Sequence, residues 1–131
     1  MTYLVDTDWV IDFLKGKSGA LSLFTTLSRD GIAISLVIYG EIYEGIYYGA
    51  DPKRQERAFL ALLRGVDVLQ LNRQIMKRFA RIRGELRAKG TIIADPDILI
   101  AATAFYHQLT LVTRNTKHFK RVPGLSIYSA K

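Results

Sequence analysis

The sequence contains no cysteine and only two histidines. Without thiols there is neither a disulfide framework nor a thiolate zinc site, so a bound metal ion would be held by oxygen ligands. Oxygen ligands favour hard cations such as Mg²⁺ or Mn²⁺. The two histidines, His107 and His118, fall near predicted turns, and we assign both to the surface rather than to a metal site.

Long apolar runs are also lacking. The longest, which begins at Ile98, is broken well short of the about 20 residues that a membrane-spanning helix needs. The N-terminus has no basic segment followed by an apolar stretch and a cleavage site. These absences predict a cytoplasmic protein without membrane contact. With 49% hydrophobic residues, the 131-residue chain is expected to form a single domain, residues 1–131, around its own core.

Negative charge is scarce in the second half of the chain. Residues 1–67 carry 7 basic and 9 acidic side chains, whereas residues 68–131 carry 12 basic and 3 acidic ones, a net charge of +9. Much of the excess falls on the predicted helix 72–89. Such a distribution favours a polyanionic partner, for which nucleic acid is the natural candidate. The alternative is a basic surface that serves only solubility.

The hydrophobic pattern alternates between short apolar runs and segments with helical spacing. This alternation predicts an α/β fold with a mostly parallel sheet covered by helices on both faces. Ligands of such sheets bind beyond the carboxyl ends of the strands, where Asp6 and Asn115 are expected. The predicted strands are residues 3–5, 32–34, 66–71, 109–113 and 125–128, and the main helices are residues 7–14, 18–27, 36–48, 52–63, 72–89 and 96–106.

Three acidic residues lie next to apolar segments. Asp6 follows a predicted buried strand, Glu41 lies within an apolar helix, and Asp97 precedes the apolar run 98–102. Gathered carboxylates repel each other unless a divalent cation neutralises them, and such a site suits hydrolysis of a phosphodiester. Each acid also has a simpler interpretation, as a helix cap, a solvated residue or a first-turn acid. We interpret the nearby Asp95 as the cap of its helix.

Four sequence blocks, in a fixed order over nearly the whole chain, carry a family resemblance. The chain resembles the PIN-domain ribonucleases of the VapC type, the toxins of type II toxin–antitoxin pairs. The acid before an Ile-Ala-Ala-Thr-Ala helix and the following Thr-Arg-Asn strand end are the most specific features. The blocks are Leu4-Val5-Asp6-Thr7-Asp8, Ser35 through Gly40-Glu41 to Gly45, Asp97-Ile98-Leu99-Ile100-Ala101-Ala102-Thr103-Ala104, and Leu111-Val112-Thr113-Arg114-Asn115-Thr116-Lys117-His118-Phe119.

The resemblance implies a PIN fold, with a parallel five-stranded sheet between helices. It also implies that Asp6, Glu41 and Asp97 gather around Mg²⁺ or Mn²⁺ to cleave RNA. A fourth catalytic position at the exit of the fourth strand is commonly Asp in the family and is Asn115 here, which adds no negative charge and makes a second metal ion less secure. A homodimer and a VapB-type antitoxin that covers the active-site groove are further implications.

Basic and aromatic side chains supply the remaining candidates. Arg114, Lys77 and Arg81 are predicted to hold the RNA backbone, as salt-sensitive phosphate contacts do. A solvated helix face is an equally good interpretation of Lys77 and Arg81. The tyrosines of the predicted helix 36–48 recur at three-to-four spacing, which is more typical of core or dimer packing than of base stacking. They are Tyr39, Tyr43, Tyr47 and Tyr48.

Two other functions stay open at this point. Residues 4–10 also resemble the opening motif of haloacid-dehalogenase-type phosphatases, in which the first Asp is a nucleophile. That interpretation leaves Glu41 unexplained, and the chain is short for that fold. A catalytically weak RNA- or protein-binding PIN module is the other alternative, and Asn115 at a usually acidic position motivates it.

Overall fold

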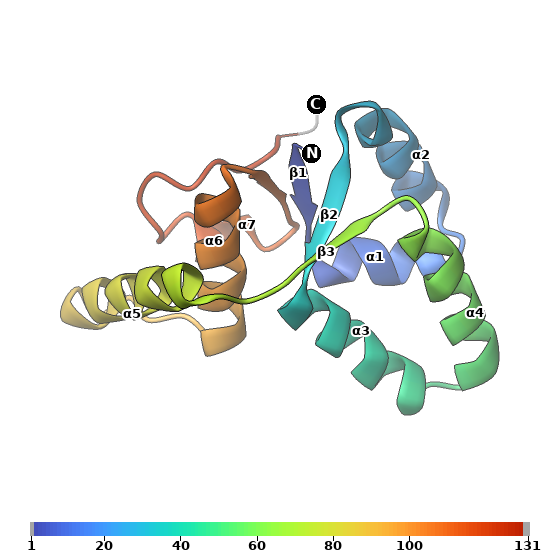
Figure 1. The fold of residues 1–131 in the computed structure, drawn as a ribbon, viewed down its shortest axis with the longest axis horizontal. Helices are drawn as coiled ribbons and strands as arrows, with labels where there is room; N and C mark the ends of the chain where they lie inside the picture. Colours follow the sequence, from blue (N-terminus) through green and yellow to red (C-terminus); the bar gives the residue numbers. More distant parts are fainter. Residues whose placement is uncertain (1, 130–131) are drawn as a thin grey trace.

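The computed structural model describes residues 2–129, which contain a four-stranded parallel sheet (Figure 1). The strand order is β3-β2-β1-β4, so β1 lies between β2 and β4. In the register of the sheet, Leu4 of β1 pairs with Ala33 of β2 on one side and with Leu111 of β4 on the other. The strands are β1 (Tyr3–Val5), β2 (Ile32–Ser35), β3 (Asp67–Leu69) and β4 (Thr110–Val112).

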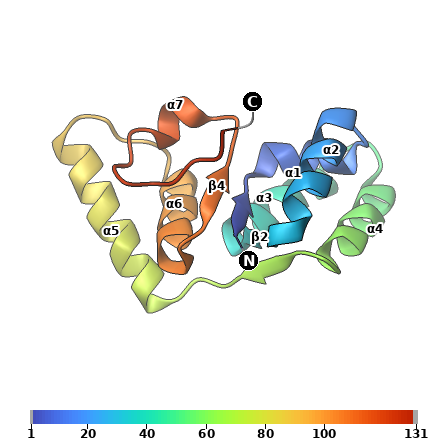
Figure 2. The same cartoon turned by 90° about the horizontal axis from the view of Figure 1, so that it is seen from above.

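Helices connect the strands and flank the sheet, as the sequence pattern predicts. Helices α5, α6 and α7 lie together on one side of the molecule and α1 to α4 on the other (Figures 1 and 2). The helices are α1 (Thr7–Leu14), α2 (Ser18–Leu27), α3 (Leu36–Tyr47), α4 (Pro52–Leu63), α5 (Arg73–Ala88), α6 (Asp95–His107) and α7 (Thr116–Phe119), and a 3-10 turn, η1 (Ser28–Asp30), precedes β2.

The core explains why these segments fold where they do. All four residues of β2 are buried, as expected for a central parallel strand that is covered on both faces. Helix α6 is apolar on most of its circumference and packs mainly against α5. Ser35 ends β2 and caps α3 by accepting a hydrogen bond from the Ile38 amide at 3.1 Å. This cap starts α3 at the carboxyl end of the sheet.

The fifth predicted strand is corrected by the structure. Residues 125–128 form a single parallel bridge between Ile127 and Leu111 rather than a strand. Two backbone hydrogen bonds hold this segment, from the Leu111 amide to the Ser126 carbonyl and from the Tyr128 amide to the Leu111 carbonyl, each at 2.8 Å. A turn at Gly124, whose φ is +81°, brings the chain back to β4 only briefly.

The predicted cap of α6 is also corrected. The helix begins at Asp95 itself, its N-cap is Ala94, and no side chain caps it. Asp95 instead accepts a hydrogen bond from the guanidinium of Arg83 on α5 at 2.8 Å. Pro96 in the first turn has no backbone N–H and a φ suited to a helix, so this turn has one donor fewer for a side-chain cap to satisfy.

No helix within residues 2–129 combines the length and the apolar character needed to cross a bilayer.

Candidate active site

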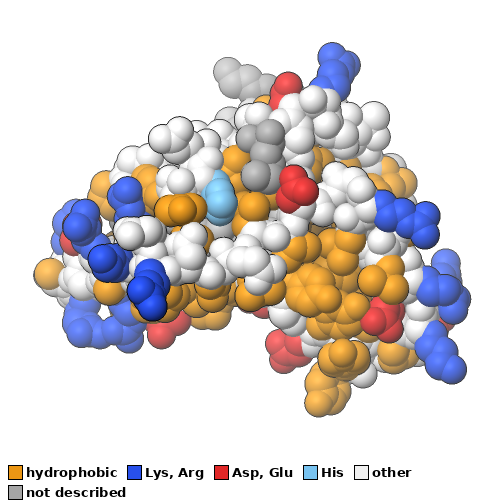
Figure 3. Space-filling view, in the orientation of Figure 1, with side chains coloured by type: hydrophobic (Ala, Val, Ile, Leu, Met, Phe, Trp, Pro, Cys, Tyr) orange, Lys and Arg blue, Asp and Glu red, His pale blue; other side chains and the backbone are white. Residues whose placement is uncertain are grey.

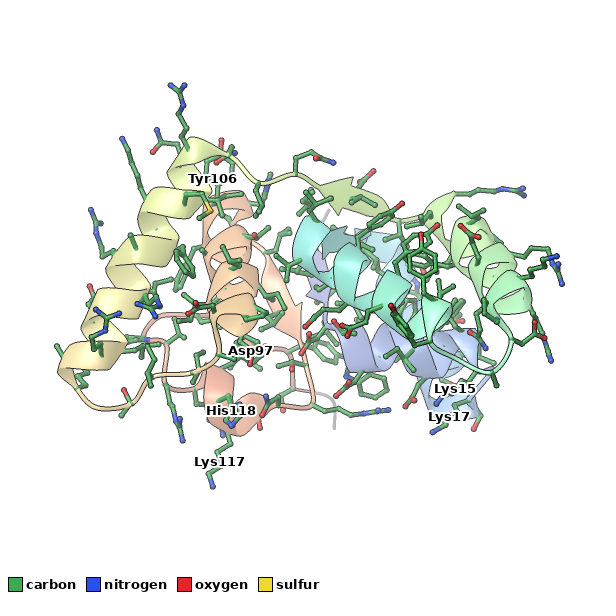
Figure 4. All side chains as sticks on the ribbon, turned by 90° about the horizontal axis from the view of Figure 1, so that it is seen from below. Lys15, Lys17, Asp97, Tyr106, Lys117 and His118 are labelled. Carbon is green, nitrogen blue, oxygen red and sulfur yellow. The ribbon has the colours of Figure 1, made fainter. Side chains whose placement is uncertain are left out.

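The three predicted acids meet at the carboxyl end of the sheet. Asp6 follows β1 and caps α1, and Glu41 belongs to α3. Asp97 stands in the first turn of α6 (Figure 4). All three side chains are half-buried. Segments that are 35 and 56 residues apart in the chain therefore supply one site, because parallel strands present their carboxyl ends at the same edge of the sheet.

The electrostatics of the three acids show that they act on one another. Burial raises the pKa of each carboxyl group above its usual value. The negative charge of Asp6 further raises the pKa values of Glu41 and Asp97, and Asp97 does the same to Glu41. Asp8, an exposed neighbour, adds a smaller effect of the same sign. The site is therefore an anionic cluster that is costly to keep fully ionised without a cation.

Two threonine hydroxyls hold the carboxylates in place. Thr113, at the end of β4, donates to Asp6 Oδ2 at 2.7 Å, while the Thr7 amide donates to Asp6 Oδ1 at 2.8 Å. Thr7 Oγ1 donates to Glu41 Oε1 at 2.6 Å. Each carboxylate oxygen has two lone pairs, so these bonds leave acceptor capacity for another ligand. The hydroxyls orient the acids and lower the pKa values that burial raises.

Asn115 reaches the edge of this cluster together with His118. The backbone amide of Asn115 donates to Thr113 Oγ1 at 3.0 Å, which links the start of α7 to the hydroxyl that holds Asp6. The Asn115 side chain lies 2.8 Å from His118 Nδ1. His118 Nδ1 in turn lies 4.0 Å from Asp97 Oδ2, and Figure 4 shows His118 and Asp97 as neighbours. Asn115 thus joins the predicted acids through its neighbours.

Arg114 points into a contact that the sequence did not predict. Its Nη1 lies 2.6 Å from Asp12 Oδ2, and its guanidinium carbon lies 3.9 Å from the centre of the Trp9 ring. Hydrogen bonding to Arg114 holds the pKa of Asp12 below its usual value. The guanidinium clamps the β4–α7 loop onto α1, and 44% of its side chain remains exposed. Its predicted contact with the RNA backbone stays a prediction.

Lys77 and Arg81 lie away from the acids. Both are exposed on α5, over which Lys and Arg side chains gather (Figure 3). They line a hollow that also includes Tyr106, which Figure 4 places at the opposite end of α6 from Asp97. The structure therefore separates them from Asp6, Glu41 and Asp97, and their predicted contact with RNA stays a prediction.

The tyrosines of α3 divide into two groups. Tyr39 and Tyr43 pack against Phe59 of α4, with ring centres 5.6 Å from the Phe59 ring in both cases. Tyr43 donates to Glu56 at 2.8 Å, and this bond raises the pKa of the Tyr43 phenol. Tyr47 and Tyr48, in contrast, are 65% and 89% exposed. Packing inside the fold accounts for Tyr39 and Tyr43, whereas Tyr47 contacts the Tyr43 ring at 5.4 Å between ring centres but stays mostly exposed.

The cluster suits a divalent cation in charge and ligand type. The possible ligand atoms are the carboxylate oxygens of Asp6, Glu41 and Asp97 and the side-chain amide oxygen of Asn115. Hard cations prefer oxygen ligands of this kind. Among residues 2–129, no three Asp, Glu or His side chains stand close enough to form a closed ligand set. The three acids therefore interact electrostatically, but their side chains do not form a complete coordination sphere.

Sequence reasoning missed three residues of this site. Thr7 and Thr113 are the hydroxyls that hold the acids; Thr113 directly follows β4, and Thr7 lies two residues after the end of β1. The sequence predicts a surface position for His118, and 46% of its side chain is exposed, but its ring lies against Asp97 and Asn115. The spacing of three residues between Asn115 and His118 was a usable signal, because one helical turn brings such residues together.

Comparison with known proteins decides the family. The model of the PIN domain matches residues 3–125. The chain belongs to the PIN-domain family. Among curated proteins, it is 31% identical over 127 residues to "Ribonuclease VapC1" of Methanocaldococcus jannaschii, with 95% of this chain and 85% of that one covered. It is 30% identical over 129 residues to "tRNA(fMet)-specific endonuclease VapC" of Shigella flexneri, with 95% of both chains covered. The predicted VapC-type resemblance is confirmed.

Solved structures agree with this assignment. A VapBC2 complex from Rickettsia felis bound to a promoter DNA fragment has a TM-score of 0.91 at 26% identity, and the match covers 100% of both chains. A DNA-bound VapBC from Salmonella typhimurium has a TM-score of 0.89 at 27% identity, with 98% of this chain and 97% of that chain covered. The predicted PIN fold is confirmed, and the phosphatase alternative loses its support.

Proposed function

We propose that the protein is a ribonuclease that hydrolyses RNA phosphodiester bonds with Mg²⁺ or Mn²⁺ and acts as the toxin of a toxin–antitoxin pair. The observation that carries the proposal is the set of three half-buried carboxylates whose pKa values are all raised by burial and by neighbouring charge. The relatives named above, a ribonuclease and a tRNA(fMet)-specific endonuclease, support the choice of RNA as the substrate.

The roles of the residues follow from their positions. Asp6, Glu41 and Asp97 would hold the cation, with Asn115 as an uncharged neighbour. A bound cation would polarise the phosphoryl oxygen and lower the pKa of the attacking water. Thr113 and Thr7 keep Asp6 and Glu41 oriented before substrate arrives, so the carboxylates need little rearrangement during the reaction.

An antitoxin partner is the second part of the proposal. The solved relatives named above are complexes of a toxin with its antitoxin. A groove of about 600 Å³ has apolar walls from α1 and α3 and polar side chains from the start of α4, and its wall includes Ile42, the residue that follows Glu41 on α3. We assign this groove to an apolar segment of a VapB-type antitoxin. Inhibition of RNA cleavage by such an antitoxin, relieved by Leu14→Lys in the groove wall, tests the assignment.

A homodimer and a cytoplasmic location complete the proposal. The exposed Tyr47 and Tyr48 at the end of α3 supply apolar surface, and Figure 3 shows a broad apolar patch on that side of the molecule. A light-scattering mass of two chains, which falls to one chain in Tyr47→Ser/Tyr48→Ser, would support a dimer built on this surface. The cytoplasmic location stays a prediction.

The decisive experiment compares two acids that are two residues apart. Asp97→Asn should lower kcat/KM for RNA on the order of 100-fold or more, because it removes one charged group of the reacting site. Asp95→Asn is the matched control, since Asp95 is exposed and paired with Arg83, and its cleavage rate should stay close to that of the wild type. Both are assayed on transfer RNA with Mg²⁺, with Mn²⁺ and with chelator, after purification away from any partner.

The same assay addresses the binding-module alternative. RNA binding that needs neither a divalent cation nor Asp97, together with no cleavage under any condition, would favour a module without catalysis. Asn115, which lacks the charge of the usual Asp, is the observation behind that alternative. Cleavage that persists in chelator, or equal losses in Asp97→Asn and Asp95→Asn, would contradict the proposed site.

A further inference from the structure

A second hollow, lined mostly by basic and polar side chains, lies between the N-terminal part of α5 and the C-terminal end of α6. Its volume is about 260 Å³. This is slightly below the range of about 300–1,000 Å³ that is typical of pockets for drug-sized ligands, so it suits one nucleotide-sized group. All of its lining residues are exposed, and they are Gln74, Lys77, Arg78, Arg81 and Tyr106. We call it the α5/α6 hollow.

The cations of the α5/α6 hollow are available to an anion. No carboxylate of residues 2–129 lies within 4.0 Å of the charged groups of Lys77, Arg78 or Arg81. Arg78 is partly engaged, since its guanidinium carbon lies 4.9 Å from the centre of the Phe105 ring. Lys77 and Arg81, one helical turn apart, are left to bind a phosphate together.

An aromatic ring stands beside these cations. Tyr106 is 46% exposed, an unusual position for a large aromatic residue at the end of a buried helix. A base that stacks on such a ring gains contact area, while the neighbouring cations bind its phosphate. Gln74 adds an amide that can donate to and accept from a base edge. The combination is that of a nucleotide site rather than of a simple charged surface.

The position of the α5/α6 hollow relative to the acids decides what kind of RNA it fits. Asp97 and Tyr106 are nine residues apart on α6, which corresponds to about 13 Å along the axis and about half a turn around it. They therefore face opposite sides of the helix, at its two ends (Figure 4). An RNA strand that runs straight through the acidic site does not reach Tyr106. A folded RNA, which presents distant segments at once, can contact both places.

We propose that the α5/α6 hollow is an auxiliary RNA-binding site, which holds a phosphate and an adjacent base of a folded RNA away from the cleaved bond. The inference rests on the proposed ribonuclease function for the identity of the polyanion. It extends that function by making RNA shape, rather than only the sequence at the cut, a source of selectivity.

The first test measures equilibrium binding of a transfer RNA and of an unstructured 12-nucleotide RNA by fluorescence anisotropy. Asp97→Asn is the parent protein, so that little RNA is cleaved during the measurement. Lys77→Gln/Arg81→Gln should weaken transfer-RNA binding on the order of tenfold and reduce the slope of log K against log salt by about 1 to 2, because one or two phosphate contacts are lost. Binding of the short RNA should change less than twofold.

Two further variants separate charge from stacking. Tyr106→Ala should weaken transfer-RNA binding about 5-fold or more with no change in the salt slope, because stacking carries no net charge. The control is Lys53→Gln/Arg57→Gln, which removes the same two charges at the same spacing from exposed positions on α4. It should leave transfer-RNA binding within about twofold of the parent, since only distant screened charge is lost. Thermal unfolding and light scattering check that fold and mass are unchanged.

The outcomes distinguish this inference from the proposed function. Equal losses for the α5 and α4 variants would mean that only net charge matters, and equal losses for both RNAs would place Lys77 and Arg81 in the path of every substrate. Either result overturns the auxiliary site. Weaker binding of a partner protein by these variants, with RNA binding unchanged, also overturns it. Cleavage by the wild type with no effect of the three substitutions would keep the ribonuclease and reject the hollow. Selective loss of transfer-RNA binding in a protein that cleaves no RNA would do the reverse.

Discussion

Helices α3 and α5 are similar in regularity but opposite in the way they present charge. Glu41 on α3 is half-buried, receives a hydrogen bond from Thr7 and has a pKa raised by burial and by three neighbouring acids. Lys77 and Arg81 on α5 are exposed and unpaired within residues 2–129. Buried, oriented charge suits chemistry, where position decides the rate, whereas exposed charge suits attraction of a polyanion, where number and salt decide the affinity.

Substitution of the buried, oriented Asp6 should have a large effect on the rate of RNA cleavage. Asp6→Asn keeps the shape but removes a charge that two hydrogen bonds hold in place, so we expect cleavage to fall on the order of 100-fold. Asp8→Asn removes the same charge from an exposed position two residues on, and its rate should stay within a few-fold of the wild type. Initial rates on transfer RNA at saturating Mn²⁺ measure both. A similar loss in both variants would mean that the net charge of the region, rather than the position of Asp6, controls the rate.

Loss of a holding hydroxyl should have an intermediate effect. Thr113→Val preserves the size of the side chain but leaves Asp6 Oδ2 without its donor and the Asn115 amide without its acceptor. Because a residue that orients a metal-binding carboxylate acts indirectly, we expect a loss of about 10-fold in cation affinity or in kcat. Thr113→Ser, which restores the hydroxyl, should recover most of it. Calorimetric titration of Mn²⁺ and single-turnover cleavage separate the two effects, and full activity of Thr113→Val would show that Asp6 needs no such support.

The acids were within reach of the sequence, whereas their supports were not. Asp6, Glu41 and Asp97 stand out because a carboxylate beside an apolar run is costly, and the family blocks aligned on the same residues. Arg114 shows the limit of this reasoning, since its pairing with Asp12 and its stacking on Trp9 depend on how the loop after β4 crosses α1. Asp95 shows the same limit, because the interpretation as a cap ignored Arg83 on a neighbouring helix.

The strand count failed for a related reason. Residues 125–128 have a strand-like composition, but whether they pair with β4 depends on the angle at which the chain leaves the turn at Gly124. The β-propensity of residues 125–128 does not determine that angle, because it depends on tertiary contacts. Long periodic elements such as α5 were predicted to within a residue or two because their apolar face alone specifies them.

An acid at position 115 should change the affinity for the cation by a smaller factor. Asn115→Asp adds a fourth carboxylate at the edge of the cluster, beside His118. Since carboxylates bind hard cations more strongly than amides do, we expect Mn²⁺ affinity to rise several-fold, on the order of 1 kcal/mol or less. Asn115→Ala is the matched control and should not raise it. Calorimetry without RNA gives the answer directly, and unchanged affinity in Asn115→Asp would place residue 115 outside the reach of the cation.

The smallest expected effect is on stability in the absence of metal. The folded state raises the pKa of Asp97, so this group contributes stability at low pH that is lost as the pH rises through its folded-state pKa. Asp97→Asn removes this loss, and its unfolding midpoint in chelator should therefore exceed that of the wild type by a margin that widens as the pH rises above about 4 through the folded-state pKa of Asp97 and then stays constant. Thermal unfolding at several pH values measures the margin. A margin that narrows with pH would mean that Asp97 is stabilised, rather than destabilised, in its ionised form.

The brief pairing of the C-terminal segment with β4 has a consequence for solubility. A parallel sheet has two edges, and each exposes amides and carbonyls that another chain can pair with, which is a route to aggregation. The two hydrogen bonds around Leu111 occupy that template on the β4 edge, while the opposite edge, β3, is only three residues long and begins with the exposed Asp67. Residues 125–128, although too short to form a strand, thus protect the β4 edge from pairing with a strand of a neighbouring molecule.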